Sequence, residues 1–429
     1  MNVFLLLGLF AVCLVLRMPI SMSIMVGCVA LCLAGGFYNM EFFISGVLNA
    51  SDSFPLLAIP FFMLAGNIMC AGGIANRLVK VAETVVGHFT GGMGLITIVA
   101  CFMFAAIAGS AVATIAAIGA MMIPMMIDKG YEREYSSALA ACASTMGPIV
   151  PPSVLFITYG VIANVSVSTM FIAGAIPGAI MGSALAIVNY VISRKNGFKG
   201  TGRRATAKEI GAALWDAKLS LLMPVIILGF IYGGIVTPTE GATVSVIYSL
   251  IVSVFIYKEM KFRDIVPVFL NTVSGAGSIM IIVAPAIIFG RLMAMERIPQ
   301  FISDFLTAQI ASPVVFALFV NIVLLVVGMF METTSSILIL SPIFVPLAAK
   351  YGFSPLHFGM FMIINLTIGL CTPPVGLCCF ISAKIGGVTF QSLFKYLLCF
   401  VAALLTCLLL ITYIPELTLF LPRLLGYRV

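Results

Sequence analysis

Apolar segments follow one another along this chain, and the polar stretches between them are short. Hydrophobic residues make up 62% of the 429 residues and charged residues only 9%, whereas a soluble domain carries about a quarter charged residues. A surface this apolar cannot face water, so the bilayer must be the solvent and no sizeable soluble domain is expected. Residues 1–16 lead into a further apolar segment without a cleavage site, so we interpret them as a membrane helix rather than a signal peptide.

Residue types that carry enzymatic or metal chemistry are scarce. The eleven cysteines fall mostly inside apolar runs without a C-x-x-C pair, and His88 and His357 are the two histidines of the sequence. This pattern favours packing over a zinc, haem or iron–sulfur site. There is no G-x-x-x-x-G-K-[ST] motif and no set of residues for a catalytic triad. We therefore expect no ATP hydrolysis, no enzymatic activity and no cofactor, which leaves transport driven by an ion gradient.

The net charge of +7 comes from basic residues that lie between the apolar spans, where they indicate topology. Residues 194–209 form the longest polar stretch, with six basic residues and one acid. We place this stretch, Arg17 and the basic loop 258–263 on the cytoplasmic side. The expected spans are then 2–16 inward, 19–36 outward, 219–236 outward and 242–257 inward. The first helices of the two halves point in opposite directions, and both chain termini are expected in the periplasm.

The two halves of the chain are related by a constant offset. Pro151-Pro152 and Pro373-Pro374 differ by 222 positions, so residues 110–152 align with 332–374 without a gap. The same offset relates Pro124 to Pro346, Gly130 to Gly352, Thr145 to Thr367 and Gly147 to Gly369. Two amphipathic stretches, 73–93 and 296–312, also correspond and suit helices that lie in the membrane interface. Together these features predict an all-α polytopic membrane protein built from two inverted repeats.

Each half contains a proline-rich segment that cannot form a continuous helix. Adjacent prolines remove two amide donors and force the preceding residue away from α geometry. Broken helices at membrane depth are tolerated where they line a cavity or bind something. The freed carbonyls together with nearby Ser and Thr hydroxyls make a hard-oxygen site suited to a small alkali cation. Helix N-termini beside the break attract anionic substrate groups.

Each half also contains a Ser/Thr-rich segment, 109–114 or 332–336, at the turn between two short apolar stretches. Stretches 94–109 and 110–127 are each shorter than the ~20 residues of a comfortable membrane crossing, which predicts a re-entrant hairpin. A partner hairpin, 313–331 with 333–347, is expected to enter from the opposite face. Any single Ser or Thr here could instead donate a hydrogen bond to a carbonyl of its own helix, or its small size could permit close packing of helices. The duplicated pairing of tip and break favours a functional site.

Two acidic residues lie at breaks in the apolar pattern. Glu332 occupies a hairpin tip, and a carboxylate in an apolar run costs at least about 2.5 kcal/mol on insertion scales, so a role in sodium or proton coupling is expected. A hydrogen bond across the tip is the structural alternative. Glu240, in Thr-Pro-Thr-Glu at 237–240, is expected to cap a helix N-terminus.

Several motifs resemble the large membrane subunit of tripartite ATP-independent periplasmic (TRAP) transporters. They are the run 58–66 (AIPFFMLAG), residues 87–92 (GHFTGG), residues 237–240 and the two proline breaks. The resemblance covers essentially the whole chain. The tips and breaks also resemble the more distant divalent-anion/sodium symporters, with Thr114 and Ser336 at the Ser of the tip motif. The Asn that follows in that motif is replaced here by Ile115 or Ile337.

The resemblance implies an elevator mechanism, in which a transport domain slides across a scaffold. It implies a multi-pass protein of the bacterial inner membrane, working with a small four-helix membrane subunit and a periplasmic substrate-binding protein. Typical substrates are small carboxylates, and we favour sialic acid. The expected sodium and substrate contacts are as follows. Sodium site 1 comprises Ser110, Thr114, Gly147 and Val150; sodium site 2 comprises Glu332, Thr333, Ser336, Gly369 and Thr372; substrate contacts are Ser144, Thr145, Ser153 and Thr367.

The expected division of the chain follows the repeats. Residues 1–52 are scaffold helices of repeat 1; 53–193 hold a span, an arm helix, hairpin 1 and the first broken helix; 194–218 are a cytoplasmic basic linker with an amphipathic helix; 219–264 are scaffold helices of repeat 2; 265–429 hold a span, an arm helix, hairpin 2, the second broken helix and a terminal helix. Two alternative functions remain open. One is a stand-alone sodium/anion symporter without a binding protein, and the other is a membrane scaffold or enzyme that transports nothing.

Overall fold

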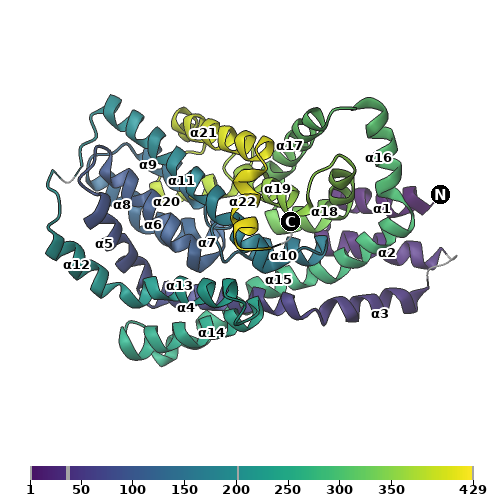
Figure 1. Cartoon of the computed structure of the whole chain (residues 1–429), viewed down its shortest axis with the longest axis horizontal. Helices are drawn as coiled ribbons and strands as arrows, with labels where there is room; N and C mark the ends of the chain where they lie inside the picture. Colours follow the sequence, from purple (N-terminus) through teal and green to yellow (C-terminus); the bar gives the residue numbers. More distant parts are fainter. Residues whose placement is uncertain (1, 35–38, 201, 428–429) are drawn as a thin grey trace.

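The computed structural model describes residues 2–34, 39–200 and 202–427, and within them every regular element is a helix. Most helices run along the long axis of the molecule, whereas a few near its two ends cross that direction (Figure 1). Among the described residues, eight helices are long and apolar enough to cross a membrane, or nine if α12 and α13 form one bent span. The chain is therefore a multi-pass membrane protein, as its composition predicts.

The first half of the chain forms helices α1 to α11. Their bounds are α1 (Asn2–Val15), α2 (Ile20–Leu33), α3 (Met40–Ser51), the 3₁₀ turn η1 (Phe54–Leu57), α4 (Ala58–Ala71), α5 (Ile74–Val86), α6 (Gly92–Ala108), α7 (Ala111–Thr114), the π-helical turn η2 (Ile115–Gly119), α8 (Ala120–Asp128), α9 (Arg133–Ser144), α10 (Val154–Ala163) and α11 (Val167–Asn196).

The second half forms helices α12 to α22. Their bounds are α12 (Ala207–Asp216), α13 (Lys218–Tyr232), α14 (Pro238–Leu250), the π-helical turn η3 (Ile251–Ile256), α15 (Phe262–Met295), α16 (Ile298–Gln309), α17 (Pro313–Phe330), α18 (Thr333–Lys350), α19 (Pro355–Gly369), α20 (Leu377–Gly386), the 3₁₀ turn η4 (Gln391–Leu393), α21 (Phe394–Tyr413) and α22 (Glu416–Leu424).

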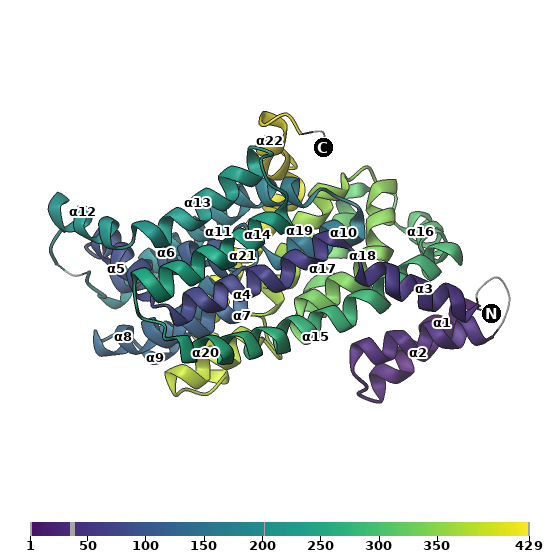
Figure 2. The ribbon, with the colours of Figure 1, turned by 90° about the horizontal axis from the view of Figure 1, so that it is seen from below.

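The two halves are structural repeats of opposite direction. Helix α6 with the run α7–η2–α8 forms one hairpin, and α17 with α18 forms the other. Each hairpin is followed by a helix, a break and a second helix: α9 and α10 in the first half, α19 and α20 in the second. The run α3–α4 leads from the end of the molecule where α16 lies to α5, and the neighbouring α15 leads back the other way (Figures 1 and 2). The inverted repeat predicted from the 222-residue offset is confirmed.

Both hairpins close at their bases with the same backbone conformation. Gly130 and Gly352, which are 222 positions apart, both have φ of +85°. This left-handed conformation is accessible to glycine without the steric cost that a Cβ would bring. The tips differ, because hairpin 1 contains the π-helical turn η2 where α18 of hairpin 2 is a single helix. Insertions of this kind are often found near functional sites.

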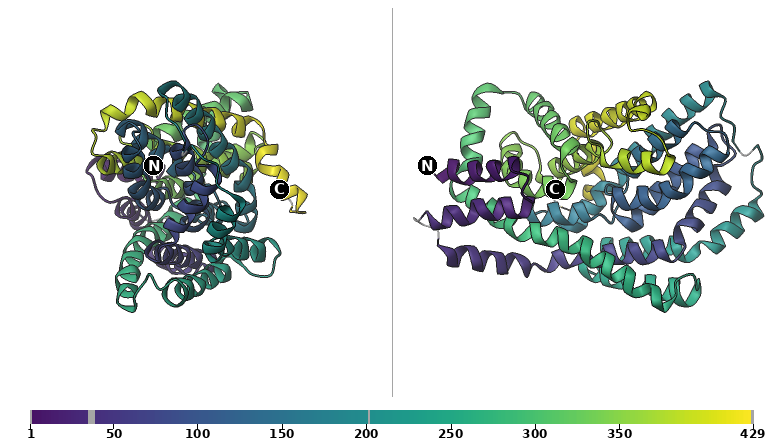
Figure 3. Two further views of the ribbon diagram at one scale, coloured as in Figure 1. Left: turned by 90° about the vertical axis from the view of Figure 1, so that its left-hand side faces the viewer. Right: turned by 180° about the vertical axis from the view of Figure 1, so that it is seen from behind.

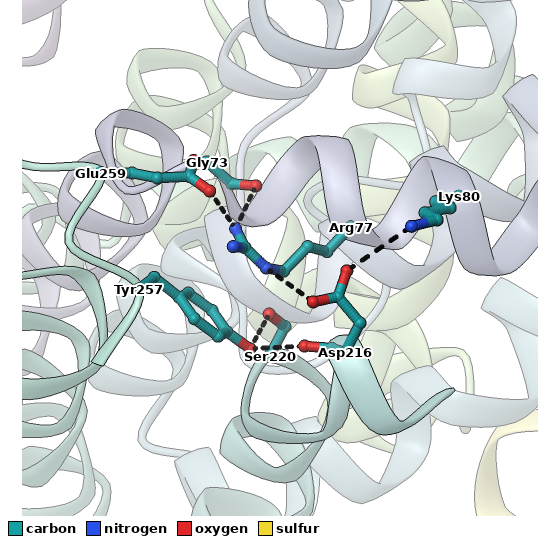
Figure 4. Close-up of polar contacts among 7 residues, drawn as sticks. All are labelled: Gly73, Arg77, Lys80, Asp216, Ser220, Tyr257 and Glu259. Atoms are coloured by element: carbon teal, nitrogen blue, oxygen red, sulfur yellow. Dashed lines mark hydrogen bonds and ion pairs between the residues drawn. The ribbon is translucent and has the colours of Figure 1, made fainter. Parts of the chain in front are cut away.

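The predicted amphipathic stretches form α5 and α16, which lie near opposite ends of the molecule (Figures 1 and 3). Arg77 fixes α5 to the second half of the chain (Figure 4). Its Nη1 lies 2.6 Å from Glu259 Oε1, its Nε lies 3.8 Å from Asp216 Oδ1, and its guanidinium lies 3.7 Å from the centre of the Tyr257 ring. Helix α5, the arm helix of the first repeat, is therefore tied to α12 and to the segment that joins η3 to α15 in the second half.

Most predicted boundaries agree with the structure to within a few residues. The hairpin arms predicted at 94–109 and 110–127 are observed at 92–108 and 111–128. Residues 35 and 36 of the predicted span 19–36, and both chain ends, lie outside the described residues. Helix α15 begins at Phe262, so the proposed segment boundary at 264 falls inside its first turn.

The helix cap expected at Glu240 involves two residues. Thr237 is the N-cap residue of α14, and its hydroxyl accepts the Glu240 N–H. The Glu240 carboxylate in turn accepts the Thr237 N–H at 2.8 Å. This reciprocal capping box gives Glu240 a structural role at the start of α14.

Candidate functional site

The two hairpin tips have matching hydrogen bonds. Ser110 and Glu332, at repeat-related positions, are the N-cap residues of α7 and α18. The Thr114 hydroxyl donates to the Ser110 carbonyl oxygen at 2.8 Å, and the Ser336 hydroxyl donates to the Glu332 carbonyl oxygen at 3.0 Å. These four residues, all assigned to sodium sites, therefore form two equivalent turns.

The hydrogen bonds accepted by the two N-cap side chains differ in length and number. The Ser110 hydroxyl accepts the Ala113 N–H at a long 3.5 Å. The Glu332 carboxylate accepts the Ser335 N–H at 3.0 Å and the Thr334 hydroxyl at 2.8 Å. Glu332 is an exposed side chain, so its charge is not isolated in the apolar interior. Both expected roles of Glu332, a hydrogen bond across the tip and a site for a coupling ion, are compatible with this geometry.

Both proline pairs interrupt helices as predicted. Helix α9 ends at Ser144 and α10 begins at Val154, while α19 ends at Gly369 and α20 begins at Leu377. In the first break, none of the hydrogen bonds found within the described chain ends on the carbonyl oxygens of Gly147 or Val150. Both residues are buried, and a buried carbonyl without a donor requires another partner, such as a cation or water.

Glycines bring each break against the hairpin of its own repeat. A Cβ on Gly147 would lie 2.6 Å from the Ser110 carbonyl oxygen and 2.8 Å from the Thr114 hydroxyl. A Cβ on Gly369 would overlap the backbone of Gly328 in α17. The absence of a side chain at these two positions therefore permits the approach of break and hairpin.

The two tips and the two breaks meet at one cavity of about 90 Å³. Five pairs of its lining residues are related by the 222-residue offset, so the cavity lies where the two repeats face each other. These pairs are Ser110 and Glu332, Ala111 and Thr333, Val112 and Thr334, Pro148 and Leu370, and Leu155 and Leu377. The volume is below the roughly 300–1,000 Å³ of pockets that enclose small molecules. In this conformation the cavity has room for ions and water rather than for an organic acid.

One polar group in the cavity wall has no hydrogen-bond partner among the described residues. The Thr333 hydroxyl is buried, and it makes no hydrogen bond within the described part of the chain. Leaving a buried hydroxyl unpaired costs about 1–3 kcal/mol. An oxygen held in this way next to Glu332 is available to a bound cation.

The predicted site residues differ in their position relative to the cavity. Ser110, Glu332 and Thr333 line the cavity, and Thr114 and Ser336 lie one turn behind the tips. The proposed substrate contacts are all buried, and none of them lines the cavity. Their hydroxyls donate to nearby backbone oxygens: Ser144 to Ala141 at 2.7 Å, Thr145 to Cys142 at 2.6 Å, Ser153 to Pro148 at 2.5 Å and Thr367 to Ile363 at 2.7 Å. In the same way Thr372 donates to Ile368 at 2.8 Å. Their roles toward substrate stay predictions.

The apolar residues of the cavity wall were not predicted from the sequence. Leu155 and Leu377 could have been found, because they are repeat-related and lie in the first turns of the helices that follow the two breaks. Met63 of α4 and Ile279 of α15 come from outside the hairpins and breaks. No motif in the sequence marks them, since they resemble the other apolar residues of their helices.

Known proteins match this chain over nearly its whole length. The family model of the DctM component of the tripartite ATP-independent periplasmic transporter matches residues 7–417. The C4-dicarboxylate TRAP transporter large permease protein DctM of Pseudomonas aeruginosa is 40% identical over 380 residues, which cover 89% of each chain. The sialic acid TRAP transporter large permease protein SiaM of Vibrio cholerae is 36% identical over 411 residues, 96% of each chain.

A longer relative and a solved structure extend the comparison. The isethionate TRAP transporter permease protein DctMQ of Oleidesulfovibrio alaskensis is 38% identical over 415 residues, which cover 97% of this chain and 65% of that protein. The YdaH transporter of Alcanivorax borkumensis has the same fold, with a TM-score of 0.62 over 87% of this chain and 88% of that chain, at 13% identity. The chain therefore belongs to the TRAP transporter family as its DctM component, the large membrane permease, and is not an enzyme.

Proposed function

We propose that this permease couples the uptake of a small organic acid to sodium ions. The observation that carries the proposal is the meeting of two hairpin tips and two broken helices at one cavity, where the described residues leave the Thr333 hydroxyl unpaired. Carbonyl and hydroxyl oxygens at a helix break are hard ligands that suit an alkali cation, and transporters with interrupted helices use such sites.

The first sodium site would use the tip and break of repeat 1. Ser110 and Thr114 supply hydroxyl and carbonyl oxygens, and the carbonyls of Gly147 and Val150 face no donor within the described chain. The second site would use Glu332, Thr333 and Ser336 at the tip, with Gly369 and Thr372 in the break. The unpaired Thr333 hydroxyl and the negative charge of Glu332 both favour a cation there.

An anionic substrate is supported by the helices around the cavity. Helices α7, α10, α18 and α20 all begin with residues that line it, so four helix N-termini face the same space. Helix N-termini carry partial positive charge and unpaired N–H groups, which favour carboxylates. Relatives are named for C4-dicarboxylates, sialic acid and isethionate, which are all small organic anions. We propose this class as substrate, with sialic acid as our first candidate.

The small volume of the cavity supports a mechanism in which the site opens and closes. The hairpins and broken helices would move as a transport domain, and Ser144, Thr145, Ser153 and Thr367 would reach the substrate when the site opens. Residues 2–36 and 219–257 with the arm helices α5 and α16 would form the scaffold. Met63 and Ile279 would then mark where the transport domain passes the helices beside it.

The family name implies assembly with further proteins. TRAP large permeases work with a small membrane subunit and a periplasmic binding protein. We propose that this chain lies in the bacterial inner membrane with both termini in the periplasm, and receives its substrate from such a binding protein.

Reconstitution of the purified permease and small subunit into vesicles tests the proposal. Uptake of N-acetylneuraminate, succinate and isethionate would be measured with and without a sodium gradient, and with and without the binding protein. We expect uptake of one of these anions that requires both. Uptake without the binding protein would favour a stand-alone symporter, and uptake that ignores sodium would refute the coupling.

A further inference from the structure

A second cavity, of about 590 Å³, lies apart from the central one. Its walls come from α3 and α15, and from α10 and α18 of the proposed transport domain. Its volume falls inside the range of roughly 300–1,000 Å³ that is typical of small-molecule pockets, whereas the central cavity falls below it. An organic acid therefore fits here in the conformation observed.

Two helices connect the cavities. Leu155 of α10 lines the central cavity and Ile162 lines the second one. On the neighbouring α18, Thr334 lines the central cavity and Pro342 lines the second. At 1.5 Å per residue, these seven or eight residues separate the two cavities by roughly 10 Å along the packed pair α10 and α18.

The polar lining of the second cavity suits an anion. Arg291 is its only charged lining residue among those described, and none of the ion pairs found in the described chain involves it. Asn49, Asn164 and Ser53 add two side-chain amides and a hydroxyl, which can donate hydrogen bonds. A guanidinium presents paired N–H donors that match the oxygens of a carboxylate or sulfonate. The rest of the wall is apolar, as in sites that enclose small organic ligands.

The topology places this cavity on the outer side. The basic residues 258–263, which end in the first turn of α15, are expected on the cytoplasmic side. Arg291 follows Arg263 by 28 residues within the same helix, or roughly 42 Å, which exceeds the ~30 Å hydrocarbon core. Arg291 therefore lies toward the opposite, periplasmic face.

We infer that the Arg291 cavity is an outer binding station, where the carboxylate or sulfonate group of the organic acid is held before it reaches the central site. The inference rests on the proposed function, because it assigns a further site to the same substrate. Arg291 binds the anionic group, and Asn49, Ser53 and Asn164 orient it. The anion then follows the α10–α18 pair to the central cavity.

The first test is uptake of succinate, N-acetylneuraminate and isethionate by reconstituted Arg291→Gln, Arg291→Lys and Asn164→Gly variants. Asn164 has φ of +55°, so glycine keeps its left-handed backbone and removes only the amide. Arg291→Gln is expected to raise the apparent KM at least about tenfold with the maximal rate changed less than about twofold. Arg291→Lys should restore part of the affinity. The control is Arg423→Gln, an exposed arginine paired with Glu416 on α22 that lines neither cavity.

The second test reads anion binding without transport. Ala294, which lines the cavity, is replaced by cysteine and labelled with a membrane-impermeant maleimide from outside, without sodium, with the parent chain as blank. Succinate, N-acetylneuraminate or isethionate should slow labelling at least about threefold when Arg291 is present and not in Arg291→Gln. If an anion slows the labelling of a protein that shows no sodium-dependent uptake, the proposed function is refuted, whereas the outer binding station is still supported. Normal uptake with unchanged KM in Arg291→Gln, or no protection by any of the three anions, would overturn the inference.

Discussion

Replacement of Gly147 by alanine tests the proposed first sodium site with a single methyl group. Gly147 has no positive φ, so an alanine backbone is unstrained there. Its Cβ would lie 2.6 Å from the Ser110 carbonyl oxygen, 2.7 Å from the Ser110 carbonyl carbon and 2.8 Å from the Thr114 hydroxyl. Two of these are backbone atoms, so the first turn of α7 must move away from the break.

The cost can be bounded from the contact. Overfilling a packed site typically costs about 1–3 kcal/mol, because neighbours must shift or leave their rotamers. Here the shifted atoms are the proposed ligands of a cation, so the cost appears in its binding. At 1.4 kcal/mol per factor of ten, we expect the sodium concentration for half-maximal uptake to rise roughly 5- to 150-fold.

The assay is sodium-dependent uptake in proteoliposomes over a range of sodium concentrations, with size-exclusion profiles and thermal unfolding as checks of folding. Gly229→Ala is the matched control, because Gly229 lies in α13 with no atom within 4 Å of a Cβ. It should leave sodium dependence unchanged and stabilise the helix by about 0.5–1 kcal/mol. Equal sodium dependence in Gly147→Ala and Gly229→Ala would show that the tip–break contact holds no cation.

Three further predictions follow from other contacts. Thr333→Val should leave the melting temperature unchanged or raise it, because the hydroxyl has no partner within the described chain. The same change should weaken sodium-dependent uptake about tenfold. A fall in melting temperature together with the loss of uptake would indicate a structural role. Arg77→Leu removes the ion pair with the partly exposed Glu259 and should destabilise the purified protein by about 1 kcal/mol in thermal unfolding; an unchanged transition would show that α5 is held by other contacts. The N–H and hydroxyl of Thr206 and the nearby Arg203 hold the pKa of Glu209 below its usual range. Its cap should therefore protect α12 from hydrogen–deuterium exchange, relative to the intrinsic amide rate at each pH, above the ordinary carboxyl pKa and lose this protection as pH falls through the lowered pKa. Protection of residues 207–216 that does not change with pH would contradict this.

The features that the sequence predicts well are those with a covalent cause. Two adjacent prolines remove two N–H donors and force the residue before them away from α geometry, so Pro151-Pro152 and Pro373-Pro374 were expected to interrupt helices. The constant 222-residue offset then related the two interruptions before any contact was known. The same offset relates five pairs of cavity residues, so a comparison of the repeats could have predicted more of the lining than hydroxyl-bearing residues alone.

The features that the sequence does not predict depend on side-chain direction. A buried hydroxyl can serve a ligand or its own backbone, and Ser144 and Thr367 donate to carbonyls three or four residues earlier. Residue type is the same in both cases, so only the three-dimensional arrangement separates them. Met63 and Ile279 reach the central cavity because their helices pack beside it. In the same way, the position of Arg291 in the second cavity depends on how four helices pack together.

The unlike hairpin tips have a consequence for the energetics of the transport cycle. A molecule made of two identical inverted copies would present equivalent sites to the two sides of the membrane, and its inward-open and outward-open forms would be equally populated at rest. Here Ser110, Ala111 and Val112 on one tip face Glu332, Thr333 and Thr334 on the other. In the proposed mechanism the two forms would therefore differ in free energy, and the unlike tips would be one source of this difference, while the gradients of the transported species would decide the direction of net flow.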